Sequence, residues 1–135
     1  MRIVVTGPPG SGKSLVGAAL AAALKASFVD GEDVHGSGAA DDAQRMPWLD
    51  AVASALVRSA PAVAACPALL RSDRDRMRAT CADAWFVELV VATTPAPHDA
   101  GESLTTDEAG MRVDAAMDLE TLVAQVVSVW SSRWA

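Results

Sequence analysis

The stretch GPPGSGKS, residues 7–14, follows the short apolar run RIVVT and matches the pattern G-x-x-x-x-G-K-[ST]. Glycines let the backbone curl so that successive N–H groups point into one concavity that fits phosphate oxygens. The helix expected directly behind the loop adds free N-terminal N–H groups and the positive end of its dipole. A Gly-rich turn without a ligand is the alternative. The position of the motif between a predicted strand and a predicted helix favours a nucleotide-phosphate site.

The same motif assigns roles to single side chains. Lys13 can reach the β- and γ-phosphates of a nucleotide, and the Ser14 hydroxyl can coordinate Mg²⁺. We therefore expect ATP and Mg²⁺ as ligands. The predicted nucleotide-binding residues are Gly7, Gly10, Ser11, Gly12, Lys13, Ser14 and Leu15.

The composition narrows the class of protein. A length of 135 residues predicts one domain over 1–135, and 51% hydrophobic with 21% charged residues indicates a globular chain. The net charge of -6 argues against a nucleic-acid surface, and no apolar run is long enough to span a bilayer. With no signal sequence in view, we expect a cytoplasmic protein without membrane or nucleic-acid partners. Cys66 and Cys81 show neither metal-ligand spacing nor a disulfide framework, which predicts two reduced thiols.

Strand and helix patterns alternate along the whole chain. Strands are expected over 2–6, 27–33, 62–66, 85–92 and 111–115, and helices over 14–25, 47–59, 73–81 and 119–130. Pro47 is expected at the first position of its helix and Ser72 as the cap of the next one. This alternation predicts a three-layer α/β domain of the P-loop NTPase type, with a parallel sheet flanked by helices.

Two apolar patterns concern packing. The helix that contains Trp48 carries a stripe of Leu49, Val52 and Leu56, which predicts a core-facing surface. Trp130 and Trp134 lie four residues apart near the C-terminus, on one helical face. Packing of this closing helix on the core is the first interpretation, and a homodimer contact is the second.

Acidic residues follow the second predicted strand in the sequence FVDGEDVH. Because ligands collect at the carboxyl ends of parallel strands, Asp30, Glu32, Asp33 and His35 should lie on the same edge as the phosphate loop. A carboxylate there can hold Mg²⁺ through water or accept the proton of an attacking hydroxyl. A solvated turn is the alternative interpretation.

Five stretches occur in order along roughly the first 92 residues: GPPGSGKS, SFVDGEDVH, DDAQRMPWLDA, ACPALLRSDRDRMR and WFVELVVA. Together they resemble the successive motifs of the bacterial gluconate kinases, which are small P-loop sugar-acid kinases related to shikimate kinase. The resemblance implies catalytic roles for Lys13, Asp30 and Glu32, and a metal site at Ser14 and Asp30. It implies that the sugar acid is contacted by Glu32, His35, Arg45, Trp48, Arg71 and Arg74.

The chain also departs from the gluconate kinase pattern. Only GSGAA separates His35 from Asp41, where the family has a longer segment around the acceptor sugar. After Ala92 the family carries an arginine-bearing lid, whereas this chain has TTPAPHDAGESLTTDEAG, without Arg or Lys. Two sources of replacement charge are a second subunit and the arginines at 71, 74 and 78. The alternative for these arginines is a solvated helix face paired with Asp73 and Asp75.

Three hypotheses of function follow. The first is a small-molecule kinase that transfers the ATP γ-phosphate to a sugar acid, gluconate giving 6-phosphogluconate. The second is a non-catalytic or regulatory nucleotide-binding protein that retains the loop and lacks the lid. The third is a P-loop kinase for another small acceptor.

Overall fold

The computed structural model describes residues 1–8, 10–33, 42–68, 70–91 and 102–132, and of Glu32 and residues 42–44 it describes the backbone alone. Five strands form one parallel sheet in the order β2-β3-β1-β4-β5. The strands are β1 (Arg2–Thr6), β2 (Ser27–Asp30), β3 (Ala62–Ala65), β4 (Trp85–Val90) and β5 (Gly110–Asp114). The predicted parallel α/β fold is confirmed.

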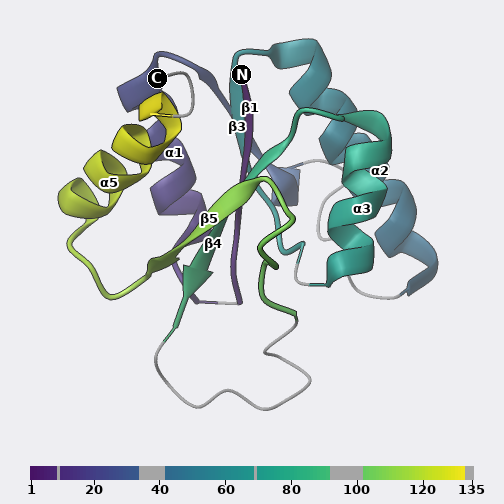
Figure 1. Ribbon diagram of the computed structural model, residues 1–135. Coiled ribbons are helices and arrows are strands. Elements are labelled where there is room, and N and C mark those ends of the chain that lie inside the picture. The colour runs from purple at the N-terminus through teal and green to yellow at the C-terminus, as the bar shows by residue number, and fades with distance from the viewer. Residues whose placement is uncertain (9, 34–41, 69, 92–101, 133–135) are drawn as a thin grey trace.

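Helices cover both faces of this sheet. They are α1 (Lys13–Leu24), α2 (Asp42–Ser59), α3 (Arg71–Thr80) and α5 (Leu119–Ser132), with a short 3-10 helix, η1, at Gly31–Asp33. Figure 1 shows α1 and α5 on one side of the sheet and α2 and α3 on the other. Among the described helices, none has the length and apolar content needed to cross a bilayer.

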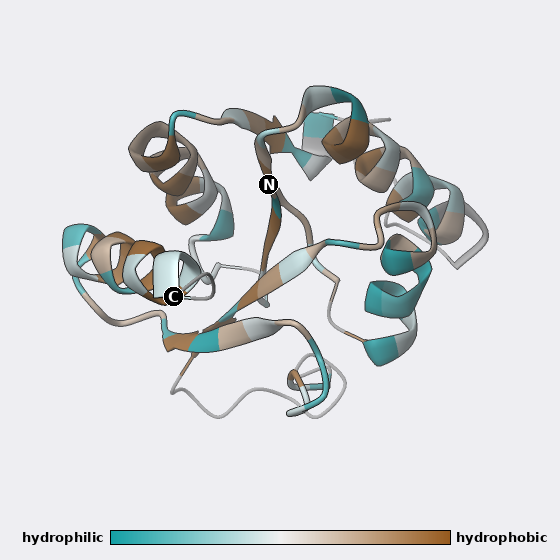
Figure 2. Cartoon of the chain, turned by 45° about the horizontal axis from the view of Figure 1, so that its top comes forward, coloured by the Kyte–Doolittle hydropathy of each residue, from teal (hydrophilic) through white to brown (hydrophobic). Residues whose placement is uncertain are grey.

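The central strand explains how one sheet supports two cores. Ile3 and Val5 point to the side of α1 and α5, whereas Val4 points to the side of α2 and α3. Successive side chains of a strand alternate between faces, so a strand covered on both faces is apolar without interruption. Figure 2 shows this contrast between the hydrophobic central strands and the strongly hydrophilic α3.

The predicted packing residues lie where the sequence pattern places them. Leu49, Val52 and Leu56 of α2 are all fully buried. They lie in the core between the sheet and helices α2 and α3, which also includes Phe86. On the opposite face, Trp130 of α5 packs edge-on against Trp85, with ring centroids 5.3 Å apart. The core-packing interpretation of Trp130 is confirmed, and Trp134 lies outside the described residues.

Two helix starts were predicted wrongly. Pro47 lies inside α2, because the helix begins five residues earlier, at Asp42. Ser72 lies in the first turn of α3, because the helix begins at Arg71 and the Asp73 carboxylate accepts a hydrogen bond of 3.1 Å from the Leu70 N–H. A side chain three residues into the helix therefore caps α3 in place of the serine. The second strand is also shorter than expected, since residues 31–33 form η1.

Candidate functional site

The phosphate loop lies between β1 and α1, at the carboxyl end of the central strand. Gly10 and Gly12 have φ angles of 81° and 88°, a region that side chains rarely adopt. A Cβ added at either glycine would meet nothing within 4 Å. The backbone conformation, rather than close packing, requires glycine at these two positions. Among the described residues, none therefore fills the space directly beside these two glycines.

A tight turn fixes the entry to the loop. The Ser11 N–H donates a hydrogen bond of 3.1 Å to the Pro8 carbonyl. A Cβ on Gly7 would lie 2.5 Å from Ser11 Oγ and 3.1 Å from Leu89 Cβ, so a side chain here would force the Ser11 hydroxyl to move. The Ser11 hydroxyl oxygen is buried and has no hydrogen-bond partner among the described residues.

Helix α1 starts without a cap of its own. Lys13 and Ser14 are its first two residues. Gly12 stands at the cap position but has no side chain to accept a hydrogen bond, and the first turn holds no acidic residue. A helix terminus with unpaired N–H groups attracts anions. Leu15, on the same turn, is exposed. The residues present therefore fit the phosphates of a nucleotide.

The acidic turn after β2 lies on the same edge of the sheet. Asp30 ends β2 and is level with Ala65 of β3, which is in turn level with Val5 of β1. Neighbouring strands are about 4.8 Å apart, which puts the end of β2 about 10 Å from the end of β1. The structure describes the Glu32 backbone in η1 but not its side chain, and His35 lies outside the described residues. The loop and the acidic turn thus face one shared edge.

Trp48 holds this acidic turn in place. Its indole N–H donates a hydrogen bond of 2.8 Å to the Gly31 carbonyl, and its side chain is 3% exposed. A Cβ on Gly31 would lie 2.7 Å from the Ala65 carbonyl oxygen and 3.3 Å from the Trp48 ring. The predicted contact of Trp48 with the acceptor is not supported by this burial. The position of Trp48 indicates that it orients the turn that carries the acids.

Arg45, one helical turn before Trp48, is held by a carboxylate of α3. It forms an ion pair with Asp73, whose side chain is 1% exposed, while that of Arg45 is 24% exposed. Cys66 lies nearby at the end of β3. Burial and, to a smaller extent, the charge of Asp73 raise the pKa of its thiol to about 12, while Lys13 and Arg45 oppose the rise. The charge of Asp73 thus acts on the Cys66 thiol in the opposite direction from those of Lys13 and Arg45.

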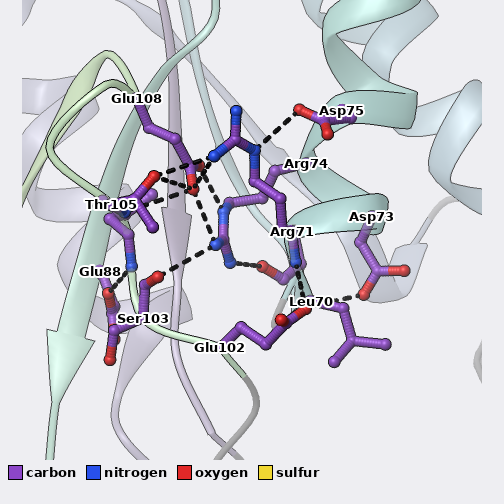
Figure 3. Close-up of polar contacts among 12 residues, drawn as sticks. Leu70, Arg71, Asp73, Arg74, Asp75, Glu88, Glu102, Ser103, Thr105 and Glu108 are labelled. Atoms are coloured by element: carbon purple, nitrogen blue, oxygen red, sulfur yellow. Dashed lines mark hydrogen bonds and ion pairs between the residues drawn. The ribbon is translucent and has the colours of Figure 1, made fainter.

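Arg74 is buried and bound on several sides, as Figure 3 shows. Its guanidinium donates two hydrogen bonds to Glu108, of 2.7 and 3.0 Å, and further ones to the carbonyls of Ala68 and Ser103. Glu108 itself is completely buried at its carboxylate. The predicted contact of Arg74 with a sugar acid is therefore at odds with the structure, because Glu108 already occupies the guanidinium.

Arg71 is engaged by acids from two segments. It donates to Asp75 one turn along α3 and to Thr105 and Asp107 in the segment before β5. Its backbone N–H donates to the Glu102 carboxylate at 3.0 Å. The predicted substrate contact of Arg71 meets the same difficulty as that of Arg74, although Arg71 is only half-buried.

Arg78 completes the cluster. It donates to Glu108 at 2.6 Å and to Asp75 at 2.9 Å, and its guanidinium lies 4.7 Å from the centre of the Phe86 ring. Burial raises the pKa of Glu108, but hydrogen bonds from Arg74 and Arg78 outweigh it and lower this pKa to about 2. The basic face of α3 is thus paired with acids, but the alternative interpretation of a solvated face paired with Asp73 and Asp75 holds only in part, because Arg74 is buried and Asp73 pairs with Arg45. The principal partner, Glu108, was missed.

The two ion pairs that the sequence did not predict, Arg45–Asp73 and Arg74–Glu108, share one feature. Asp73 and Glu108 are acids whose partners lie 28 and 34 residues away along the chain. One feature of the sequence could have indicated the pairing with Glu108. Residues 71–78 are rich in arginine, and residues 102–108 are rich in acids that could neutralise them. No group of three or more His, Cys, Asp or Glu side chains suited to a metal occurs within the described residues.

No protein-family model matches the chain. It is 34% identical over 88 residues to the thermosensitive gluconokinase of Escherichia coli K12, a match covering 56% of this chain and 47% of that one. The chain therefore spans about half the length of the curated relatives it matches.

Solved structures match over nearly the whole chain. A gluconokinase from Sinorhizobium meliloti 1021 superposes with a TM-score of 0.83 at 26% identity, covering 97% of this chain and 91% of that one. A shikimate kinase from Aquifex aeolicus superposes with a TM-score of 0.71 at 14% identity, covering 98% of each chain, a likeness of fold alone.

The fold and the loop together have the architecture of the P-loop kinases that the chain resembles. Within that class its sequence and structure relate it to the gluconate kinase family, and the predicted resemblance is confirmed.

Proposed function

We propose that the protein is an ATP-dependent kinase that transfers the γ-phosphate to a sugar acid, with gluconate giving 6-phosphogluconate. The observation that supports this proposal most is the shared sheet edge. The uncapped start of α1 and the acidic turn after β2 lie two strands apart on it. Such a spacing leaves room for a donor phosphate on one side and an acceptor hydroxyl on the other. The similarity to gluconokinases suggests which acceptor to test first.

On the donor side, the amides of Gly10, Gly12 and Lys13 would surround the phosphates, and the Lys13 ammonium would bridge the β- and γ-phosphates. The Ser14 hydroxyl would hold Mg²⁺, with Asp30 acting on the ion through water. Magnesium supplies positive charge between the phosphate oxygens when it is bound. Leu15 is exposed beside the loop and is available for a contact with the nucleotide.

On the acceptor side, Asp30 or Glu32 would orient the attacking hydroxyl and accept its proton. Arg45 is the residue proposed to bind the acceptor among the described side chains, because its side chain is 24% exposed. His35 remains a proposed acceptor contact. For Arg71 and Arg74 we replace the substrate role by that of anchoring the segment before β5.

A nucleotide-binding protein without turnover is the second candidate, and a specific observation favours it. Positive charge at the transferring phosphoryl group is worth about 10³–10⁵ in rate. The arginines of α3 that could supply this charge in place of a lid are Arg71, Arg74 and Arg78. Carboxylates bind all three. A second subunit that supplies a cation would remove this objection. A kinase for a different small acceptor is the third candidate.

One assay separates the candidates. ADP release is followed with Mg-ATP and a panel of sugar acids and uncharged polyols, for the wild type, Lys13→Ala and Lys25→Ala. Lys25 follows α1 at its far end and is the matched control. Gluconate-dependent ADP release that only Lys13→Ala abolishes supports the proposal. Binding of an unhydrolysable ATP analogue without turnover on any acceptor supports the second candidate and overturns the first.

A further inference from the structure

The start of α3 holds a carboxylate from a distant part of the chain. The N–H of Arg71, the first residue of the helix, donates a hydrogen bond of 3.0 Å to Glu102, which lies 31 residues further along (Figure 3). The preceding N–H, that of Leu70, donates to Asp73. The first N–H groups of a helix have no partner within the helix and, together with the positive end of its dipole, attract anions. Glu102 is the anion that fills the position at Arg71.

Glu102 also borders the phosphate loop. It lines a small cavity of about 20 Å³, whose other lining residues are Thr6, Gly7, Pro8, Ala68, Arg74 and Glu88. Thr6 is 1% exposed, and its hydroxyl oxygen is buried without a hydrogen-bond partner among the residues that the structure describes. The cavity therefore connects the start of the phosphate loop with the carboxylate at the start of α3, and it contains a polar group that a ligand could satisfy.

The other charged side chains at this cavity are held by partners of their own. Arg74 is bound by the buried Glu108. Glu88 pairs with Arg112 at 3.3 Å and accepts a hydrogen bond of 2.8 Å from the backbone of the segment before β5. Glu102 differs from both because it is exposed, and exposed contacts of a carboxylate contribute little to stability. Glu102 is therefore the charged group that a competing anion replaces most easily.

We propose that Glu102 is an internal competitor of the acceptor, because its carboxylate occupies the position at the start of α3 that the carboxylate of the sugar acid takes on binding. This inference rests on the proposed kinase function. While Glu102 is in place, the cavity has room for about one water molecule, so both carboxylates do not fit together. The two charges would also repel each other. Acceptor binding therefore requires Glu102 to withdraw, and the Thr6 hydroxyl is available as a donor to the incoming carboxylate.

Calorimetric titration tests this competition without requiring turnover. Gluconate, and sorbitol as the analogue without a carboxylate, are titrated into the wild type, Glu102→Gln and Asp107→Asn, each with Mg²⁺ and an unhydrolysable ATP analogue. Gln keeps the shape of Glu102 and removes its charge. Asp107 is the matched control, since it also ties the segment before β5 to Arg71 and is 66% exposed, but is not among the residues that line the cavity.

The expected result is a gain in affinity that is confined to gluconate. Glu102→Gln should bind gluconate about twofold to fivefold more tightly than the wild type, as expected for the removal of an exposed charge contact. Glu102→Ala, which removes the competing group altogether, should give a gain in the same direction. Sorbitol binding should not change, and Asp107→Asn should behave as the wild type. Unchanged or weaker gluconate binding in folded Glu102→Gln overturns the inference, and so does an equal gain for sorbitol.

The amide of Arg71 provides a second measurement, by nuclear magnetic resonance. In the wild type, gluconate should shift the Arg71 N–H signal, because this N–H exchanges Glu102 for the acceptor. The amide of Lys25, at the far end of α1, is the control signal. Gluconate that binds without shifting the Arg71 signal overturns the inference and leaves the kinase proposal in place. If neither the wild type nor Glu102→Gln binds gluconate, the proposed function fails together with the inference.

Discussion

The indole N–H of Trp48 donates a hydrogen bond of 2.8 Å to the Gly31 carbonyl, and this contact ties α2 to the acidic turn after β2. Trp48 and Arg45 lie three residues apart on α2, and Arg45 reaches across to Asp73 of α3. One turn of helix thus connects the acidic turn with the start of α3. The acceptor side depends on α2 being held at both of these points.

Trp48→Phe should lower the free energy of unfolding by about 1–3 kcal/mol, because a buried carbonyl loses its donor. Urea denaturation followed by circular dichroism measures this loss. Trp130→Phe is the control on the opposite face, where an edge-on aromatic pair is weakened by about 0.5–1.5 kcal/mol. We expect acceptor binding to weaken in Trp48→Phe only. Equal effects of both variants on acceptor binding would contradict the positioning role.

Gly110→Ala should disrupt the pairing of β4 with β5. A Cβ at Gly110 would lie 2.1 Å from the Phe86 carbonyl oxygen, which belongs to the neighbouring strand. We expect a loss of at least about 1–3 kcal/mol, typical of overpacking. Gly10→Ala, where a Cβ meets open space, should cost only the backbone strain of about 1–2 kcal/mol. Thermal denaturation of both variants compares the two costs, and a more stable Gly110→Ala would contradict the strand pairing.

Glu108→Gln should be among the most damaging single changes in the chain. It leaves the buried Arg74 without its counter-charge, and breaking a buried ion pair typically costs about 3–5 kcal/mol. Asp107→Asn is the matched control, since this side chain is 66% exposed and exposed pairs contribute about 0–1 kcal/mol. The midpoints of urea denaturation give both values. Similar midpoints for the two variants would show that Glu108 does not anchor the segment.

The same carboxylate makes the protein sensitive to acid. The pKa of Glu108 is lowered in the folded state from 4.5 to about 2, so the folded form holds its proton less tightly than the unfolded chain. Its contribution, up to about 3 kcal/mol, is complete above pH 4.5 and is lost as the pH falls toward 2. Urea denaturation at pH 7, 4 and 3 should show this loss in the wild type and in Asp107→Asn. If the free energy of unfolding falls with pH as steeply in Glu108→Gln as in the wild type, groups other than Glu108 cause the acid sensitivity.

How far the sequence predicts the structure depends on the range of the interactions. Strand β1 was predicted to the residue, because an apolar run before a glycine loop is a local signal. The predicted starts of α2 and α3 were wrong. Proline is common in a first helical turn and serine is common as a cap, but α2 begins before Pro47 and α3 begins before Ser72. The loop conformation at Gly10 and Gly12 follows from the motif.

The charge partners could not be predicted in the same way. An arginine-rich helix and an acidic segment both look solvated when they are read alone. Only the fold brings Glu108 beneath α3 and turns an exposed-looking acid into a buried one. For the same reason Arg74 was predicted as a substrate contact, since nothing local distinguishes a free guanidinium from one that is already bound.

The burial of Cys66 and Cys81 offers a way to watch the protein open. Both thiols lie in the core beneath α2 and α3, and burial holds their pKa values high, at about 12 and about 11. A maleimide reagent should therefore leave the folded chain untouched and modify it only when this half of the molecule separates from the sheet. Mass spectrometry of the labelled chain would then time the loosening of the acceptor side, without an engineered probe.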